Sequence, residues 1–207
     1  MNTYKYIEKA VFVGFIIAAL FSFTGFTAFA TQCEQIPNEI FRLHVLANSD
    51  SEQDQALKFA VRDRLLKETG ALFADCRTKA QAMEAANANL QNLTRVAQEE
   101  IDRQGYDYRV SVAVEQVFFE NRQYDDITLP AGNYDALRVL IGEGAGKNWW
   151  CVLFPAMCLP TAQERTAVSD LSDVLNDAQL QAVQGGQYEF KFKTIELYER
   201  LKHWFGW

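Results

Sequence analysis

The chain has 207 residues, of which 49% are apolar and 13% aromatic, so most of it is expected to fold around a sizeable core. It carries 20 basic and 27 acidic side chains, a net charge of −7, which excludes the basic footprint that nucleic-acid binding requires. Four cysteines and two histidines, with no CxxC or HxxxH spacing, predict that the chain holds no metal.

The first thirty residues have the three parts of a secretory signal segment. Lys5 and Lys9 precede an uncharged run over residues 10–30, which ends in the small-x-small tripeptide Ala28-x-Ala30. We therefore expect cleavage after Ala30. The alternative is an uncleaved membrane anchor, because a helix over this run would rise about 31 Å. In both cases the rest of the chain leaves the cytoplasm.

The four cysteines can pair in an oxidising compartment. Cys151 and Cys158 flank a Phe-Pro pair, and a chain reversal there would bring them together as a disulfide. Cys33 and Cys76 would then form a second pair or stay free. The alternative is that all four cysteines are reduced and buried.

The main body, residues 31–160, alternates between two periodicities. Apolar residues recur every three or four positions over 51–69, where Asp50 or Ser51 caps a helix that Gly70 ends, and over 78–104, a long helix ended by Gly105. A period of two, or a continuous apolar run, predicts strands at 40–47, 108–114, 134–141 and 149–154.

The C-terminal third of the chain is less regular. Residues 161–187 are polar and predict a linker or excursion, and the alternation over 188–193 predicts a last strand. An amphipathic helix is expected over 194–205. Together the elements predict an α+β fold, with a mixed or antiparallel sheet packed against two helices, plus a C-terminal helix, after the N-terminal signal segment.

Two patterns that could carry chemistry are weak. The loop at Gly142, Gly144 and Gly146 joins two predicted strands and has no following helix, so it predicts a strand connection rather than a phosphate site. Cys151 and His44 could form a nucleophile–base pair, but Cys151 lies in an apolar run where burial blunts a thiol. No GxxxxGK[ST], HExxH or GxSxG motif is present.

A group of polar side chains gathers where the first predicted strand of the body meets its first helix. Its members are Arg42, His44, Asn48, Asp50, Arg62 and Asp63. These residues form either a network of caps and salt bridges that holds the helix to the sheet, or a surface that contacts a partner. The aromatic C-terminus, Trp204 to Trp207, either folds back on the core or contacts a partner or membrane.

Two long blocks of the sequence resemble the stage II sporulation protein R family. The first block is RLHVLANSDS at 42–51 with DQALK at 54–58 and VRD at 61–63; the second is LPAGxYxALRV at 129–139 with GxGxGxNWWCVxFP at 142–155. The tail FKFK at 190–193 with Glu196 is also similar to the family, whereas Ala156-Met157 departs from the Pro-Leu expected there.

The resemblance implies a signalling role without catalysis. Proteins of this family are made in the forespore and secreted into the space between forespore and mother cell. There they trigger a membrane-embedded aspartic protease, stage II sporulation protein GA, which cleaves the precursor of the mother-cell factor sigma-E. The resemblance supplies no catalytic residue and no cofactor. The alternatives are a Cys/His hydrolase of cell wall or peptide, and a structural module of the intermembrane space.

Overall fold

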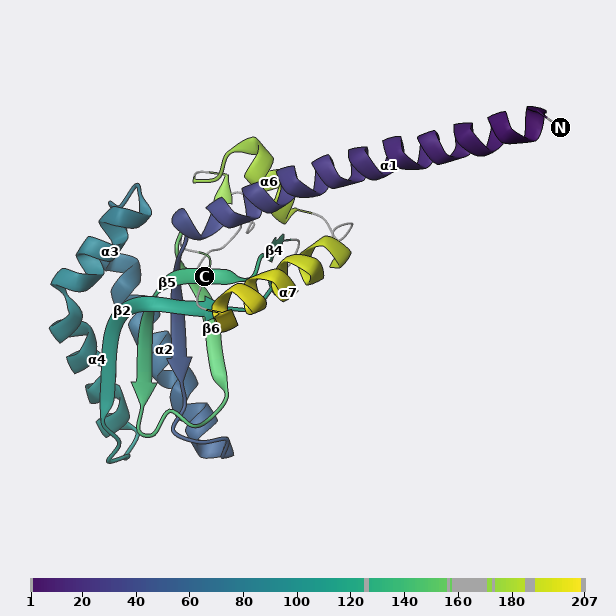
Figure 1. Cartoon of the computed structure of the whole chain (residues 1–207). Coiled ribbons are helices and arrows are strands. Elements are labelled where there is room, and N and C mark those ends of the chain that lie inside the picture. Colours follow the sequence, from purple (N-terminus) through teal and green to yellow (C-terminus); the bar gives the residue numbers. More distant parts are fainter. Residues whose placement is uncertain are drawn as a thin grey trace.

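A computed structural model of the chain describes residues 2–124, 127–155, 157, 171–172, 174–184 and 189–205. The elements in chain order (Figure 1) are α1 (Asn2–Gln35), η1 (Ile36–Asn38), β1 (Phe41–Leu46), α2 (Glu52–Leu72), α3 (Lys79–Ala88), α4 (Leu90–Arg103), β2 (Val110–Phe119), β3 (Arg122–Tyr124), β4 (Ile127–Leu129), β5 (Gly132–Ile141), β6 (Asn148–Phe154), α6 (Asp177–Val183) and α7 (Glu189–Phe205). The predicted α+β class is confirmed.

Four strands form the main sheet, in the order β2-β5-β1-β6. β1 pairs in parallel with β5 and antiparallel with β6, and β2 pairs antiparallel with β5, so the sheet is mixed. β3 and β4 form a separate two-stranded sheet. All six residues of β1 are buried, because the protein covers this central strand on both faces.

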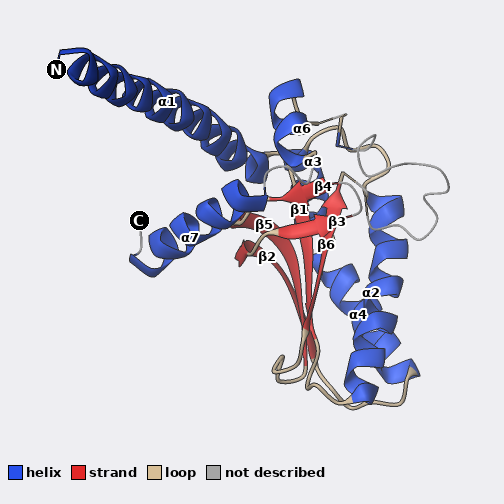
Figure 2. Ribbon diagram, turned by 90° about the vertical axis from the view of Figure 1, so that its right-hand side faces the viewer, coloured by secondary structure: helices blue, strands red, loops and turns tan. Residues whose placement is uncertain are grey.

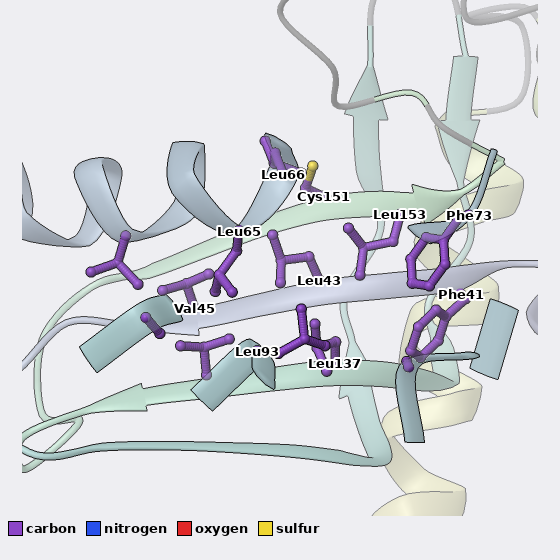
Figure 3. Close-up of a cluster of buried hydrophobic side chains, with 14 of the residues drawn as sticks. Phe41, Leu43, Val45, Leu65, Leu66, Phe73, Leu93, Leu137, Cys151 and Leu153 are labelled. Carbon is purple, nitrogen blue, oxygen red and sulfur yellow. The ribbon is translucent and has the colours of Figure 1, made fainter. Parts of the chain in front are cut away.

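The helices α2, α3 and α4 pack on one face of the main sheet, which is seen edge-on in Figure 2 with α2 and α4 along one side. Leu43 and Val45 of β1 point toward these helices, together with side chains from β5 and β6 (Figure 3). Leu57, Val61 and Leu65 of α2 meet them from the other side, as their four-residue spacing predicts. This is the larger core of the molecule.

The ends of α2 differ in part from the prediction. Of the two predicted caps the structure uses Ser51, whose side chain accepts a hydrogen bond from the backbone N–H of Asp54. The predicted stop at Gly70 is wrong, because α2 continues to Leu72 and is capped by Phe73. The ring of Phe73 packs against Phe41 at 6.2 Å, so burial of this ring carries the helix past the glycine.

The single long helix predicted over 78–104 is also wrong in one respect. It is two helices, α3 and α4, which meet at Asn89, a residue with φ −113° and ψ 12°. The Asn89 side chain donates a hydrogen bond to the Ala85 carbonyl, so this amide competes with the regular helical pattern at the junction. Because the apolar stripe continues across the junction, periodicity alone does not reveal the break. Gly105, at φ 81°, follows α4 as predicted.

The strand predicted over 188–193 is wrong where the structure describes it. α7 begins at Glu189 and runs through these residues into the predicted helix of 194–205. A short alternating run fits a strand and a helix almost equally well. Glu189 and Lys193 are four residues apart with the acid first, a spacing that favours a helix.

A second core cluster lies on the opposite face of the main sheet. In it, side chains from η1, β4 and the N-terminal half of β5 pack against residues that follow the main body. Leu171, Leu175 and Val183 are buried in it, and Asn176 starts α6 with a capping box. These residues belong to the predicted linker or excursion 161–187, most of whose remaining residues lie outside the described part of the chain.

The helix α1 runs unbroken through Ala30, and its N-terminal part extends away from the body (Figure 1). Near its C-terminal end Phe29 and Cys33 are buried with Ala182 of α6 and Ile195 of α7. Over the described residues, no helix combines the length and the hydropathy that a membrane span requires. Cleavage after Ala30 stays a prediction, and it would fall between two of these buried side chains.

The cysteines are in different states. Cys151 is disulfide-bonded, so the alternative with four reduced cysteines is wrong. Cys33 and Cys76 have free thiols, and burial raises the pKa of Cys33 to about 12. Cys158 lies outside the described residues, so its predicted pairing with Cys151 stays a prediction.

Candidate functional site

The structure separates the six polar residues predicted as a site into three places. Arg42 and His44 lie on β1 and are buried beneath the face of the sheet opposite α2. Asn48 and Asp50 lie in the connection from β1 to α2, and the last pair lies on the outer surface of α2. The partner-surface interpretation requires these side chains to be exposed. Because Arg42 and His44 are buried, they are not part of an exposed surface.

Asn48 and Asp50 act as a structural network, the first of the two predicted interpretations. Asn48 accepts a hydrogen bond from the Glu143 N–H at 3.0 Å and donates one to the buried Asp54 carboxylate at 2.9 Å. Asp50 accepts from the Lys147 N–H at 2.6 Å. These bonds fasten the connection between β5 and β6 to the start of α2.

The glycine loop between β5 and β6 is a strand connection, as predicted. Gly142 and Gly144 have φ values of 57° and 62°. A Cβ on Gly146 would lie 2.1 Å from the Ser49 carbonyl oxygen, so the backbones approach too closely for any other residue. Protein oxygens already accept from each N–H over 143–147, which leaves this loop no donors for a phosphate.

The buried guanidinium of Arg42 is surrounded by aromatic rings. Its carbon lies 3.9 Å from the centroid of Phe119 and 4.8 Å from that of Tyr134. Its Nη2 donates to the Tyr124 hydroxyl at 2.5 Å. We call these four residues, together with Trp150, the Arg42 cluster.

His44 lies beside the Arg42 cluster and is neutral at ordinary pH. Its ring stacks on Trp150 with centroids 4.0 Å apart and planes at 8°. Burial lowers the pKa of His44 to about 4, because a charged imidazole would lose its water there.

The alternative of a nucleophile–base pair between Cys151 and His44 is wrong. In the register of β1 and β6, Cys151 pairs with Leu43, and His44 pairs with Trp150. The Cys151 side chain thus points to the helix face, among the residues of Figure 3, whereas His44 points to the opposite face. Cys151 is also disulfide-bonded and cannot form a thiolate.

Arg62 and Asp63 remain as accessible members of the predicted site. The Arg62 guanidinium forms a 2.7 Å ion pair with Asp63. It also lies 4.3 Å from the centroid of Trp149 and 4.8 Å from that of Phe59, which is 37% exposed. An arginine in contact with two aromatic rings is typical of residues that contribute strongly to protein interfaces.

Sequence reasoning missed several aromatic and basic residues that surround the predicted site. They are Phe59, Phe119, Arg122, Tyr124, Tyr134, Trp149 and Trp150. Two features could have indicated some of them. Consecutive tryptophans in a strand must point to opposite faces, and Phe59 lies off the apolar stripe of α2.

The remaining surface includes a cavity and the amphipathic helix α7. The cavity of about 250 Å³ lies between the end of α1, the start of β5 and α7, and is lined by Cys33, Asn133 and Glu199 among others. Trp204 of α7 is 78% exposed, while Gly206 and Trp207 lie outside the described residues. No cluster of metal-ligating side chains occurs in the part of the chain that the structure describes.

The body that carries these residues matches a known family. The family model of stage II sporulation protein R (spore_II_R) matches residues 37–164, which begin in η1 and exclude α1. The chain is 36% identical over 138 residues to Stage II sporulation protein R of Bacillus subtilis (strain 168), a match that spans 67% of this chain and 62% of that relative. No solved structure matches.

This chain therefore belongs to the stage II sporulation protein R family, and its role lies in sporulation. The match includes both sequence blocks, and with them the Arg42 cluster and Arg62 with its ring contacts. The resemblance predicted from those blocks is confirmed.

Proposed function

We propose that this protein is a secreted signal of endospore formation that activates a membrane-embedded aspartic protease, stage II sporulation protein GA. The activated protease then processes the sigma-E precursor in the mother cell. Membership of the stage II sporulation protein R family across the folded body carries the proposal. The chain crosses the cytoplasmic membrane into the space between forespore and mother cell, and cleavage after Ala30 releases it there.

In this mechanism the chain acts by binding. A ligand shifts a protein between an inactive and an active state only through its different affinity for the two states. Moving the protease from 1:99 to 99:1 in favour of the active state takes about 5.5 kcal/mol of that difference. No bond has to be made or broken by this chain.

The edge of the sheet at β6 is the contact surface that we favour. Trp149 and Trp150 are consecutive on this edge strand and face opposite sides of the sheet. Phe59 and Arg62 flank the first tryptophan, and the exposed Arg122 lies over the second, 5.7 Å from its ring centroid. Tryptophan and arginine are the side chains that most often dominate binding energy at protein interfaces. The C-terminal Trp204 offers a separate contact to the membrane.

Co-expression in a non-sporulating host tests the proposal. The full chain, the protease and the sigma-E precursor are produced together, and precursor cleavage is followed by immunoblot. Cleavage is expected only when the chain is present. Cleavage that does not depend on the chain, or none in its presence, contradicts the proposal and favours the structural-module alternative.

A matched pair of variants tests the contact surface in the same assay. Arg62→Ala is expected to reduce cleavage at least tenfold, which corresponds to about 1.4 kcal/mol of lost binding. Arg95→Ala, which removes an exposed arginine from α4, is the control and is expected to leave cleavage unchanged. Equal cleavage by both variants contradicts a contact at the β6 edge.

A further inference from the structure

Among the described residues Arg42 has no acidic partner, although it is fully buried. The side chain is 0% exposed, and its one hydrogen bond goes to the neutral Tyr124 hydroxyl. The Nε and Nη1 groups find no hydrogen-bond acceptor among the described residues. A buried charge without a paired acid is rare, because the lost hydration costs several kcal/mol.

The described surroundings of Arg42 supply aromatic rings and phenol groups but no anion. The groups that act on its charge are the phenols of Tyr124 and Tyr134 and a second cation, Arg122. Contacts with three rings stabilise the cation in part, but they leave its Nε and Nη1 donors without acceptors among the described residues. Arg42 and Arg122 thus place two positive charges near each other in the described part of a chain whose net charge is −7.

We propose that Arg42 receives a carboxylate from the protein partner, the side chain of an aspartate or glutamate in an acidic segment. The carboxylate takes the place of the Tyr124 hydroxyl and accepts hydrogen bonds from the guanidinium, which matches a carboxylate in shape and charge. Arg122, exposed on the same small strand as Tyr124, attracts the acidic segment toward the site. This inference rests on the proposed function, since it supplies the chemistry by which the partner is recognised.

A carboxylate that binds Arg42 has to displace the side chain of Tyr124. This tyrosine is only partly buried and ends β3, a three-residue strand that pairs with β4 alone. Displacing its ring breaks one described hydrogen bond and leaves the main sheet intact. The other rings around the guanidinium, those of Phe119 and Tyr134, are fully buried and hold it in place.

Acetate is the probe for this site, and it needs no protease. The unfolding midpoint of the full chain in detergent micelles is measured in sodium acetate and in sodium chloride at equal ionic strength and neutral pH. Acetate is expected to raise the midpoint by about 2–4 °C, the effect of a ligand well above its dissociation constant on a chain of this size. No rise in the wild type overturns the inference.

Three variants assign the effect to the guanidinium. Arg42→Met keeps the bulk of the side chain and is expected to lose the acetate effect, with its own midpoint in chloride at or above the wild-type value. Tyr124→Phe removes the competing hydroxyl and is expected to enlarge the effect, and Arg62→Met is the control that preserves it. An undiminished acetate effect in Arg42→Met overturns the inference.

Precursor cleavage then identifies the source of the carboxylate. With a folded Arg42→Met chain, cleavage in the co-expression assay is expected to fall at least tenfold. If the wild type activates the protease and Arg42→Met does so equally, the partner does not supply the carboxylate and the inference fails, while the proposed function stands. If the wild type itself fails to activate, the proposed function fails, and the acetate experiment still decides whether the site exists.

Discussion

The two faces of β1 are equally buried but built from different chemistry. Toward α2 the strand presents Leu43 and Val45 to a core made of hydrocarbon side chains (Figure 3). Toward the opposite face it presents Arg42 and His44, whose polar side chains are buried against aromatic rings. Burial stabilises the first face and costs free energy on the second. Because burial of these polar groups lowers stability, we infer that they are kept for a function on the polar face.

The helix face should respond most strongly to truncation. Leu43→Ala removes a fully buried side chain and is expected to lower the free energy of unfolding by about 2–5 kcal/mol. Denaturant titration of the full chain gives the value. Leu197→Ala, at a position 61% exposed, is the control and should change it by no more than about 0.5 kcal/mol. Similar losses at both positions would contradict the assignment of the main core.

The polar face should make stability depend on pH. The pKa of His44 is lowered from 6.5 to about 4 in the folded chain, so the unfolded chain binds the proton first as the pH falls. Stability is therefore full above pH 6.5 and declines toward pH 4 by about 3 kcal/mol, at about 1.4 kcal/mol per unit of pKa difference. Below pH 4 this contribution changes no further.

His44→Gln is the control for that decline, because glutamine does not titrate. Unfolding free energies of the variant should lose most of their slope between pH 6.5 and pH 4. A slope equal to that of the wild type would show that His44 is not buried as a neutral ring.

Replacing a glycine should cost more at Gly146, in the loop that joins β5 and β6, than at Gly105, which follows α4. Gly146→Ala drives a methyl group into the Ser49 carbonyl and is expected to cost about 1–3 kcal/mol, the usual range for overpacking. Gly105→Ala has open space and meets only the strain of φ 81°, about 1 kcal/mol. Thermal unfolding of both variants measures the difference, and a larger loss at Gly105 would contradict the close approach of the loop to Ser49.

Arg42→Met, on the polar face of β1, is the substitution with the smallest expected effect on stability. Replacing a buried charge by an apolar side chain of similar volume is neutral or stabilising in many proteins. The unfolding free energy should therefore stay equal to the wild-type value or rise, in contrast to Leu43→Ala on the other face of the same strand. A loss as large as that of Leu43→Ala would make Arg42 a structural residue.

Periodicity predicted the α+β class, the four strands of the main sheet and the helices of its core, because each buries one regular apolar face. It failed where a single side-chain interaction determines where a helix ends. The Asn89 side chain ends α3 inside a continuous stripe, and the contact of Phe73 with Phe41 extends α2 past Gly70. A local alternation over 188–193 did not distinguish a strand from the helix α7.

The candidate site was predicted less completely than the fold. The residue types of Arg42, His44 and Arg62 indicated it, but the rings around these side chains come from α2, β2, β3, β5 and β6. Contacts between residues about eighty positions apart, such as that of Arg42 with Tyr124, leave no pattern in one sequence. Asn48 and Asp50 lie at the predicted junction of strand and helix, but their partners in the loop, the N–H groups of Glu143 and Lys147, are more than ninety positions away and could not be predicted either.

Cleavage of the sigma-E precursor by the membrane-embedded protease, measured with and without this chain exported from the same host, tests the signalling role most directly. Cleavage should appear when the chain is exported and disappear when residues 1–30 are deleted so that the chain stays in the cytoplasm. Equal cleavage in the presence and absence of the exported chain would contradict the proposal that this protein activates the protease by binding it.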